Sequence, residues 1–216
     1  MKKNLFSLGA LGMIAMLVAC SSTPAGYTVK GTLPDSTMNG KTLYILNVDK
    51  GECVDSTIVN GNTYVFEGKA DTALVAGISA NGRNSLAVFA LENGNVTIAE
   101  DGNTSGTSLN DELTRVTALL DSVNSAYYKA AEAFEGSREE WATVYENEWV
   151  PRFKEHVLEA YKNHKDDVVG YVLTQFTTIL TPAEQLELMN GFGPWLSATK
   201  RVSTTKTTLE SQRQTA

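Results

Sequence analysis

The chain has 216 residues, 42% of them hydrophobic, and a formal net charge of −7 at pH 7. An acidic chain is poorly suited to bind nucleic acid or an anionic membrane surface, so the composition argues against both as partners. The length is sufficient to bury a sizeable core in one or two domains.

The first 19 residues have the anatomy of a signal peptide. Two lysines follow the initial methionine, an apolar run extends from Leu5 to Val18, and the run ends in Leu17-Val18-Ala19-Cys20, which resembles a lipobox. The run is too short to cross a membrane. We therefore expect residues 1–19 to be removed and lipid to be attached to Cys20, so that the chain meets the membrane through this lipid. Removal of the two lysines would leave a net charge of −9.

Residues 20–26 are small and polar and predict a flexible tether. Beyond Gly26, short segments rich in β-branched and aromatic residues alternate with Gly, Asn and Asp, as expected of an antiparallel β domain over 27–101. The predicted strands lie near 27–33, 42–48, 54–60, 63–69, 73–80, 85–91 and 94–100.

Asn60-Gly61 is the clearest turn signal, because this dipeptide favours the type I′ turn of a two-residue hairpin. We expect Val54, Thr57 or Ile58, Tyr64 and Phe66 on either side of it to be the half-buried residues of the flanking strands. Asn81-Gly82 and Asn93-Gly94 are predicted to join the later strands in the same way. Without a helical pattern in between, the strands indicate a β-sandwich or an open barrel.

Residues 102–107 have little apolar surface and predict a linker. Apolar residues then recur every three to four positions, which predicts a helical region over 108–216 and, with the β domain, an α+β fold. Its first helix carries the stripe Leu109, Leu113, Val116, Leu120, Val123 and Tyr127.

Short capping motifs predict where the helices begin. Ser108 with Asp111 resembles a capping box, Ser137 with Glu140 is a fuller one, and Thr181-Pro182-Ala183-Glu184 opens a short fourth helix. A third helix is expected from about Asp167 to Ile179. Pro151 predicts a kink or a break in the second helix. The Thr- and Ser-rich stretch from Trp195 onward predicts a marginal helix at most.

The sequence offers no catalytic constellation. Motifs of metalloproteases, serine hydrolases, nucleotide-binding loops and dithiol sites do not occur, so neither catalytic, metal-binding nor cofactor-binding residues are predicted. His156 and His164, with Glu155 and Glu159 nearby, supply too few convergent ligands for zinc. Cys53 lies between a turn signal and a predicted strand, so it is expected to be a small, partly buried residue. A reactive thiol is disfavoured, because neither a cation nor a second cysteine accompanies it.

Aromatic side chains of the second helix raise one structural alternative. Trp141, Tyr145 and Trp149 could line a groove, although their helical spacing favours packing in the core.

The chain resembles the family called domain of unknown function 4369, found in lipoproteins of Bacteroidetes. The resemblance rests on Tyr27–Gly31, Lys41–Ile45, Val54–Thr57 with Phe66–Gly68, and Leu109–Leu113, and it spans most of residues 27–190. In that family this module commonly precedes a thioredoxin-like oxidoreductase domain with a Trp-Cys-x-x-Cys site. The sequence ends at Ala216, about where such a domain would begin, so redox activity is not implied for it.

The resemblance also implies a compartment and a modification. Surface-exported lipoproteins of this lineage carry an acidic run after the lipidated cysteine, and Ser21–Gly26 has none, which favours the periplasmic face of the outer membrane. Ser36, Ser56, Thr72 and Ser122 each follow an aspartate, as in the O-glycosylation pattern of such exported proteins. Plain turn chemistry is the alternative for these positions and is favoured at Ser56.

Three hypotheses of function follow. The first is a non-catalytic binding or scaffolding module of the outer membrane whose protein or ligand partner is unknown. The second is the N-terminal fragment of a thioredoxin-like thiol-disulfide oxidoreductase, for which a Trp-Cys-x-x-Cys site encoded downstream of Ala216 would be the sign. The third, binding of glycans or small ligands by the β domain, rests on fold analogy alone.

Overall fold

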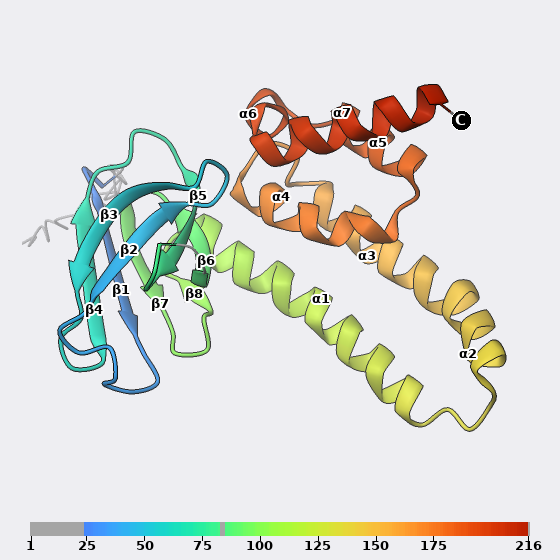
Figure 1. Cartoon of the computed structure of the whole chain (residues 1–216), viewed down its shortest axis with the longest axis horizontal. Helices are drawn as coiled ribbons and strands as arrows, with labels where there is room; N and C mark the ends of the chain where they lie inside the picture. Colours follow the sequence, from blue (N-terminus) through green and yellow to red (C-terminus); the bar gives the residue numbers. More distant parts are fainter. Residues whose placement is uncertain (1–23, 83–84, 216) are drawn as a thin grey trace, which may run out of the picture.

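The computed structural model describes residues 24–82 and 85–215, in which a β-sandwich is followed by a helical region (Figure 1). The α+β class is therefore confirmed. The predicted signal peptide and Cys20 lie outside the described residues.

Two four-stranded sheets form the sandwich. In the first, the strand order is β4-β1-β7-β8, and in the second it is β3-β2-β5-β6. Strands β1 and β7 are parallel, whereas every other described neighbouring pair is antiparallel, as predicted. The strands are β1 (Tyr27–Thr32), β2 (Thr42–Asn47), β3 (Glu52–Ile58), β4 (Thr63–Gly68), β5 (Leu74–Ser79), β6 (Ser85–Leu91), β7 (Gly94–Ile98) and β8 (Thr104–Ser105).

The inner faces of the two sheets make the core of the sandwich. Alternate residues of β1, β4 and β7 point inward, as the two-residue period of a half-buried strand requires. Each large side chain buried in this way contributes about 1.5 to 3 kcal/mol relative to an exposed one. The fully buried side chains from both sheets include Val29, Leu43, Ile45, Phe66, Ile78 and Phe89.

The turn after β3 differs from its predicted type. Asn60 pairs with Thr63, so Gly61 and Asn62 are the central residues, and positive φ occurs only at Gly61, at 64°. This is the pattern of a type II′ turn, in which glycine takes the first central position. Since β3 pairs with β2 and β4 pairs with β1, the turn carries the chain from one sheet to the other.

The burial predicted around this turn is half correct. Tyr64 and Phe66 are buried and Thr57 is half-buried, but Val54 is 42% and Ile58 66% exposed. The reason is that β3 is the edge strand of its sheet, and the pairing register shifts next to Val54, leaving it as an extra, unpaired residue. Such bulges are typical of sheet edges, where they turn a side chain away from its regular position.

The two later Asn-Gly turns have different roles. Asn81-Gly82 joins the antiparallel pair β5 and β6, as predicted. Asn93-Gly94 joins β6 to β7, which belong to different sheets, so it forms no hairpin.

The segment predicted as a linker, 102–107, contains strand β8. Thr104 and Ser105 pair with Ile98 and Thr97 of β7, and Thr104 is buried. Composition concealed this strand because its pairing uses backbone groups, and the Thr104 side chain is covered by a helix that follows.

Helix α1 (Ser108–Glu132) buries the predicted stripe. Leu113, Val116, Leu120 and Val123 are buried, and Leu109 packs against the core. The predicted capping box is wrong, because the N-cap residue is Thr107. Asp111 instead accepts a hydrogen bond of 2.9 Å from the backbone N–H of Gly106, which precedes the helix.

The side chain of Asn110 joins α1 to the sandwich. Its Oδ1 accepts from the N–H of Ala90 at 3.0 Å, and its Nδ2 donates to the carbonyl of Ala90 at 2.8 Å. Ala90 lies in β6, the edge strand of its sheet, so the amide takes the place of a neighbouring strand. One turn later, the hydroxyl of Thr114 makes an equivalent pair of hydrogen bonds with Thr104 in β8. It accepts from the backbone N–H of Thr104 and donates to the Thr104 carbonyl.

The second helical stretch reverses direction and packs against α1. It comprises α2 (Arg138–Val144), the π-helical turn η1 (Tyr145–Trp149) and α3 (Val150–Tyr161). The predicted capping box of Ser137 and Glu140 is present. Pro151 follows the π-helical turn, where Val150 donates to the carbonyl of Tyr145, five residues back. The proline thus accompanies a widened turn, while the helix continues.

The remaining helices complete the region. They are α4 (Val168–Leu173), the 3₁₀ helix η2 (Thr174–Ile179), α5 (Pro182–Asn190), α6 (Pro194–Ala198) and α7 (Lys200–Thr215). The third predicted helix therefore changes to 3₁₀ geometry halfway, and the capping box at Thr181 and Glu184 is confirmed.

Helix α7 is more regular than its composition predicts. It has 16 residues, and Val202 and Leu209 are buried. Asp49, in the turn between β2 and β3, accepts from the N–H groups of Lys200 and Arg201 at 2.8 and 3.0 Å. A carboxylate at a helix N-terminus satisfies free donors and opposes the positive end of the helix dipole. The sandwich thereby adds to the local cap of Thr199, whose hydroxyl accepts from the N–H of Val202 at 3.4 Å.

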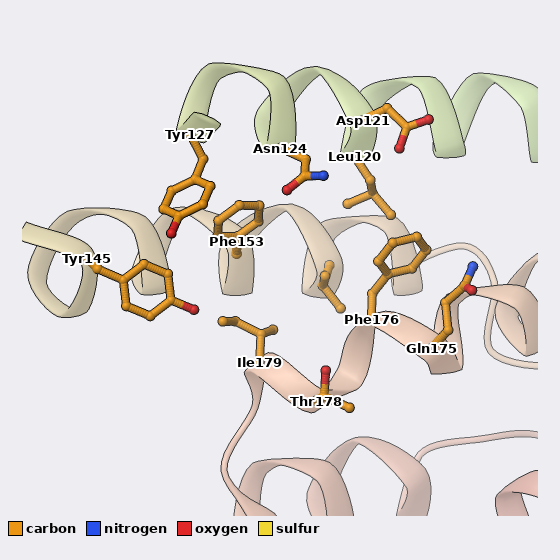
Figure 2. Close-up of a pocket in the computed structure, with 11 residues that line it drawn as sticks. Leu120, Asp121, Asn124, Tyr127, Tyr145, Phe153, Gln175, Phe176, Thr178 and Ile179 are labelled. Atoms are coloured by element: carbon orange, nitrogen blue, oxygen red, sulfur yellow. The ribbon is translucent and has the colours of Figure 1, made fainter. Parts of the chain in front are cut away.

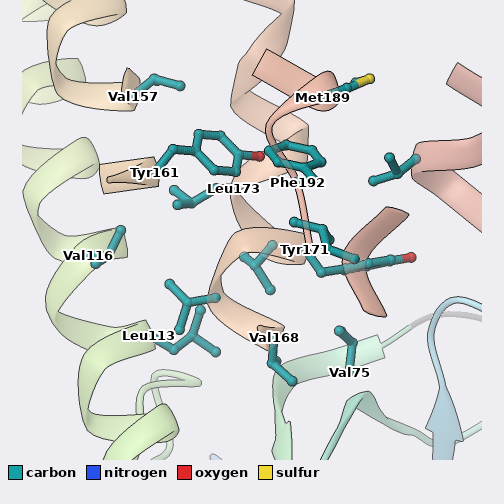
Figure 3. Packing of buried hydrophobic residues seen from close by; sticks show 14 of the residues in the cluster. Val75, Leu113, Val116, Val157, Tyr161, Val168, Tyr171, Leu173, Met189 and Phe192 are labelled. Atoms are coloured by element: carbon teal, nitrogen blue, oxygen red, sulfur yellow. The ribbon is translucent and has the colours of Figure 1, made fainter. Parts of the chain in front are cut away.

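The sandwich and the helices share a second core (Figure 3). Val75 of β5 and Ala90 of β6 belong to it, together with residues from α1, α3, α4, α5 and α7. Tyr161 and Phe192 stack within it, with ring centroids 5.2 Å apart. The predicted division at residues 102–107 therefore separates two structural regions that are packed together.

A buried histidine ties α1 to the loop before α4. The ring nitrogens of His164 lie 2.9 Å from Oε1 of Glu112 and 2.8 Å from Oδ2 of Asp167. Asp167 also caps α4 by accepting from the N–H of Gly170. Arg115 donates to both carboxylate oxygens of Glu112 at 2.7 Å. The hydrogen bonds from Arg115 and, second, from His164 lower the pKa of Glu112 to about 2.

The Asn110 contact predicts a large loss of stability on truncation. Asn110→Ala leaves the N–H and carbonyl of Ala90 buried without partners. We therefore expect the free energy of unfolding, measured in urea, to fall by about 2 to 4 kcal/mol. Asn124→Ala, at an exposed position of the same helix, is the matched control and should change stability by less than about 0.5 kcal/mol. Equal effects of the two variants would contradict the role given to Asn110.

Glu112 predicts acid sensitivity. Its pKa is lower in the folded chain than the ordinary 4.5, so its ionised form stabilises the fold above that pH. This stabilisation is lost as the pH falls from about 4.5 toward about 2. Thermal melts across this range should show a smaller loss in Glu112→Gln than in the wild type. Glu135→Gln, at an exposed site, should keep the wild-type slope, and an unchanged slope in Glu112→Gln would refute the prediction.

Candidate ligand-binding pocket

A pocket of about 290 Å³ opens between α1, the η1–α3 stretch and η2 (Figure 2). Its floor is apolar, because Leu120 and Val157 are buried there and Phe153, Phe176 and Ile179 are half-buried. Its rim is polar. The lining residues are Leu120, Asp121, Asn124, Tyr127, Tyr145, Phe153, Val157, Gln175, Phe176, Thr178 and Ile179.

A cluster of aromatic side chains forms one end of this pocket. Tyr127 of α1 lies at its centre, with ring centroids 5.2 to 5.9 Å from those of its neighbours, mostly in edge-to-face geometry. Aromatic pairs of this kind contribute about 0.5 to 1.5 kcal/mol each beyond the area they bury. The neighbouring rings are those of Tyr128, Trp141, Tyr145, Trp149 and Phe153.

The aromatic residues of the second helix were predicted either to pack in the core or to line a groove, and both arrangements occur. Trp149 is buried and Trp141 half-buried within the cluster, as core packing requires. Tyr145 reaches the pocket itself, where its hydroxyl points toward the open space (Figure 2).

The polar side chains at the rim are not engaged by the protein. Within residues 24–82 and 85–215, the side chains of Asp121, Asn124, Gln175 and Thr178 make no hydrogen bond or ion pair, and neither does the hydroxyl of Tyr145. All but Tyr145 are exposed, so water satisfies them in the free protein. They are available to a ligand, because binding would exchange water and break no internal contact.

A larger cavity of about 410 Å³, at the junction of sandwich and helices, has lining groups that the protein already uses. Asp49 is occupied as the cap of α7, and Oδ1 of Asn47 accepts from the N–H groups of Asp49 and Lys50. A ligand would have to compete with these bonds. The pocket beside α1 is therefore the better candidate.

The histidines considered as metal ligands do not converge. His156 is half-buried, with Nδ1 2.8 Å from the carbonyl of Arg152, and His164 is held between Glu112 and Asp167. In the part of the chain that the structure describes, no group of three or more His, Cys, Asp and Glu residues is placed to hold a metal ion.

Cys53 is exposed, which corrects the expectation of partial burial. Its Sγ lies 3.5 Å from the carbonyl of Asp55. The carboxylate of Asp55 accepts from the hydroxyl of Tyr27 at 2.9 Å, and burial together with this bond raises the pKa of Tyr27 to about 12. Asp55 thus anchors the edge strand β3 to β1.

The four glycosylation candidates are all exposed. Ser36 and Thr72 lie in loops, Ser56 in β3 and Ser122 in α1, where its hydroxyl donates to the carbonyl of Leu119. Their modification stays a prediction, as does lipid attachment to Cys20.

No helix in the described ranges 24–82 and 85–215 combines the length and apolar character needed to cross a membrane.

Comparison with known proteins gives one finding. A family model described as "Domain of unknown function (DUF4369)" matches residues 27–113. Neither a curated protein nor a solved structure matches the chain. The match begins at the first residue of β1, includes the eight strands that the structure describes and ends in α1 just beyond Asn110. It is shorter than the span of residues 27–190 over which the resemblance was expected. Residues 27–113 therefore form a domain of the DUF4369 family.

Proposed function

We propose that the chain is a lipoprotein anchored through Cys20 at the periplasmic face of the outer membrane, where it acts as a non-catalytic binding module. The pocket between α1, α3 and η2 is its binding site. The observation that carries this proposal is the combination of an apolar, aromatic floor with unengaged polar groups at the rim. Pockets that bind small molecules typically have this composition.

The sandwich serves as the scaffold in this proposal. It holds the start of α1 through Asn110 and the start of α7 through Asp49, while the pocket lies further along α1. The alternative of an oxidoreductase fragment gains no support from Cys53. Thiol-disulfide turnover needs a second, resolving thiol. Cys53 is the only cysteine in the sequence besides Cys20, which carries the lipid in this proposal.

Detergent partitioning tests the anchor. The wild type should enter the detergent phase, because each buried methylene of the acyl chains contributes about 0.8 kcal/mol. Cys20→Ala should move to the aqueous phase. Cys53→Ser is the matched control, since it removes the other cysteine and should partition like the wild type. A wild type found in the aqueous phase would refute the anchor.

Titration with 2-phenylethanol tests the pocket. In ¹H–¹⁵N spectra of the chain from residue 21 onward, we expect shifts confined to residues around the pocket, with a Kd of about millimolar size for so small a molecule. Asn124→Trp should block binding, because Asn124 projects from α1 over the pocket (Figure 2). Ser125→Trp, at the next exposed position, should leave binding intact. Absence of shifts at the pocket would overturn the proposed site.

A further inference from the structure

The charge at the pocket rim is negative. Among the described residues that line the pocket, Asp121 is the only charged one. Its carboxylate forms no hydrogen bond or ion pair within the described part of the chain. A ligand with a positive group at this point would supply the counter-charge that the protein does not.

The aromatic rings favour the same kind of ligand. Tyr127, Tyr145, Phe153 and Phe176 all line the pocket, and Figure 2 shows Phe176 beside Leu120, on the side where Asp121 projects from α1. The face of an aromatic ring is the negative end of its quadrupole and attracts cations. The carboxylate and the rings therefore both favour a positively charged ligand. The rings can also pack against an apolar part of that ligand.

The net charge of the residues around the pocket also favours a cationic ligand. Residues 108–190 contain 15 acidic and 7 basic side chains. Three of the basic ones are neutralised in ion pairs, which are Arg115 with Glu112, Lys154 with Glu184, and Lys162 with Glu159. The helical region around the pocket thus carries a net negative field, which raises the local concentration of cations and lowers that of anions.

The volume limits the size of the ligand. About 290 Å³ lies at the lower end of small-molecule pockets, enough for one ring or a short chain with a charged end. We infer that the pocket selects small organic cations, in which an ammonium group is joined to a single aromatic or aliphatic body. This inference rests on the proposed binding function and adds the chemical class of the ligand.

Three probes of one shape test the selection, namely 2-phenylethylammonium, 2-phenylethanol and phenylacetate, titrated at pH 7 and low salt. We expect the ammonium to bind at least about threefold more tightly than the alcohol, and phenylacetate more weakly than both. Added salt should reduce the advantage of the ammonium, because Asp121 is exposed and screened.

The variant Asp121→Asn identifies the group responsible. It should remove most of the advantage of the ammonium and leave the affinity for the alcohol unchanged. Glu132→Gln is the matched control, since it removes one exposed negative charge of the same helix away from the pocket lining, and it should preserve the order of the three probes.

The outcomes separate the two proposals. Equal binding of ammonium and alcohol, or an advantage of the ammonium that survives Asp121→Asn, would overturn the cation selection while the pocket remains a binding site. Failure of every probe to bind at the pocket would overturn the proposed binding function as well.

Discussion

The buried amide of Asn110 is the contact on which the rest of the structure depends. A sheet edge leaves backbone donors and acceptors free, and burying such an edge under a helix is costly unless those groups find partners. Asn110 pairs with both groups of Ala90, and Thr114 pairs with both groups of Thr104. One helix therefore closes the β6 edge of one sheet and the β8 edge of the other. The two contacts lie about one turn apart and fix both the rotation and the direction of α1.

The direction of α1 in turn determines where a pocket can form. A helix of 25 residues extends for about 37 Å, so its far end lies well away from the sandwich (Figure 1). The η1–α3 stretch packs along this helix, and η2 crosses beside it, which leaves space between the three elements. The Tyr127 cluster and the pocket thus depend on the same helix that the DUF4369 domain orients, although they lie beyond the matched residues.

Local signals in the sequence were sufficient to predict most elements. The strands follow a two-residue period, and the capping boxes at Ser137 and Thr181 give helix starts correctly, because each depends on residues within four positions. Errors arose where a distant partner decides the structure. Val54 and Ile58 have the pattern of inner residues, yet β3 is an edge strand, and no local feature tells which strand becomes an edge.

The same reasoning explains what could be predicted of the candidate site. The helical spacing of Tyr145 and Trp149 does not reveal that one lines a pocket and the other is buried, since this depends on the packing of η2 and α1. Asn110 carried only a weak signal of its contact with Ala90, because an asparagine near a helix start usually faces solvent or caps the helix. A polar residue next to the apolar stripe of α1, one position after Leu109, was the only available hint.

The two polar anchors and the pocket occupy different parts of the helical region, and this separation has a thermodynamic consequence. Asn110 and Asp49 secure the helices next to the sandwich, whereas the far end of α1 is held by ring contacts and a few apolar residues. Regions with fewer buried contacts open at lower free energy than the core, and a ligand that binds only the closed form stabilises it by mass action. A ligand in the pocket would thus add its contacts toward the far end of α1, where the described contacts are mainly between aromatic and apolar side chains, and the sandwich would remain unaffected.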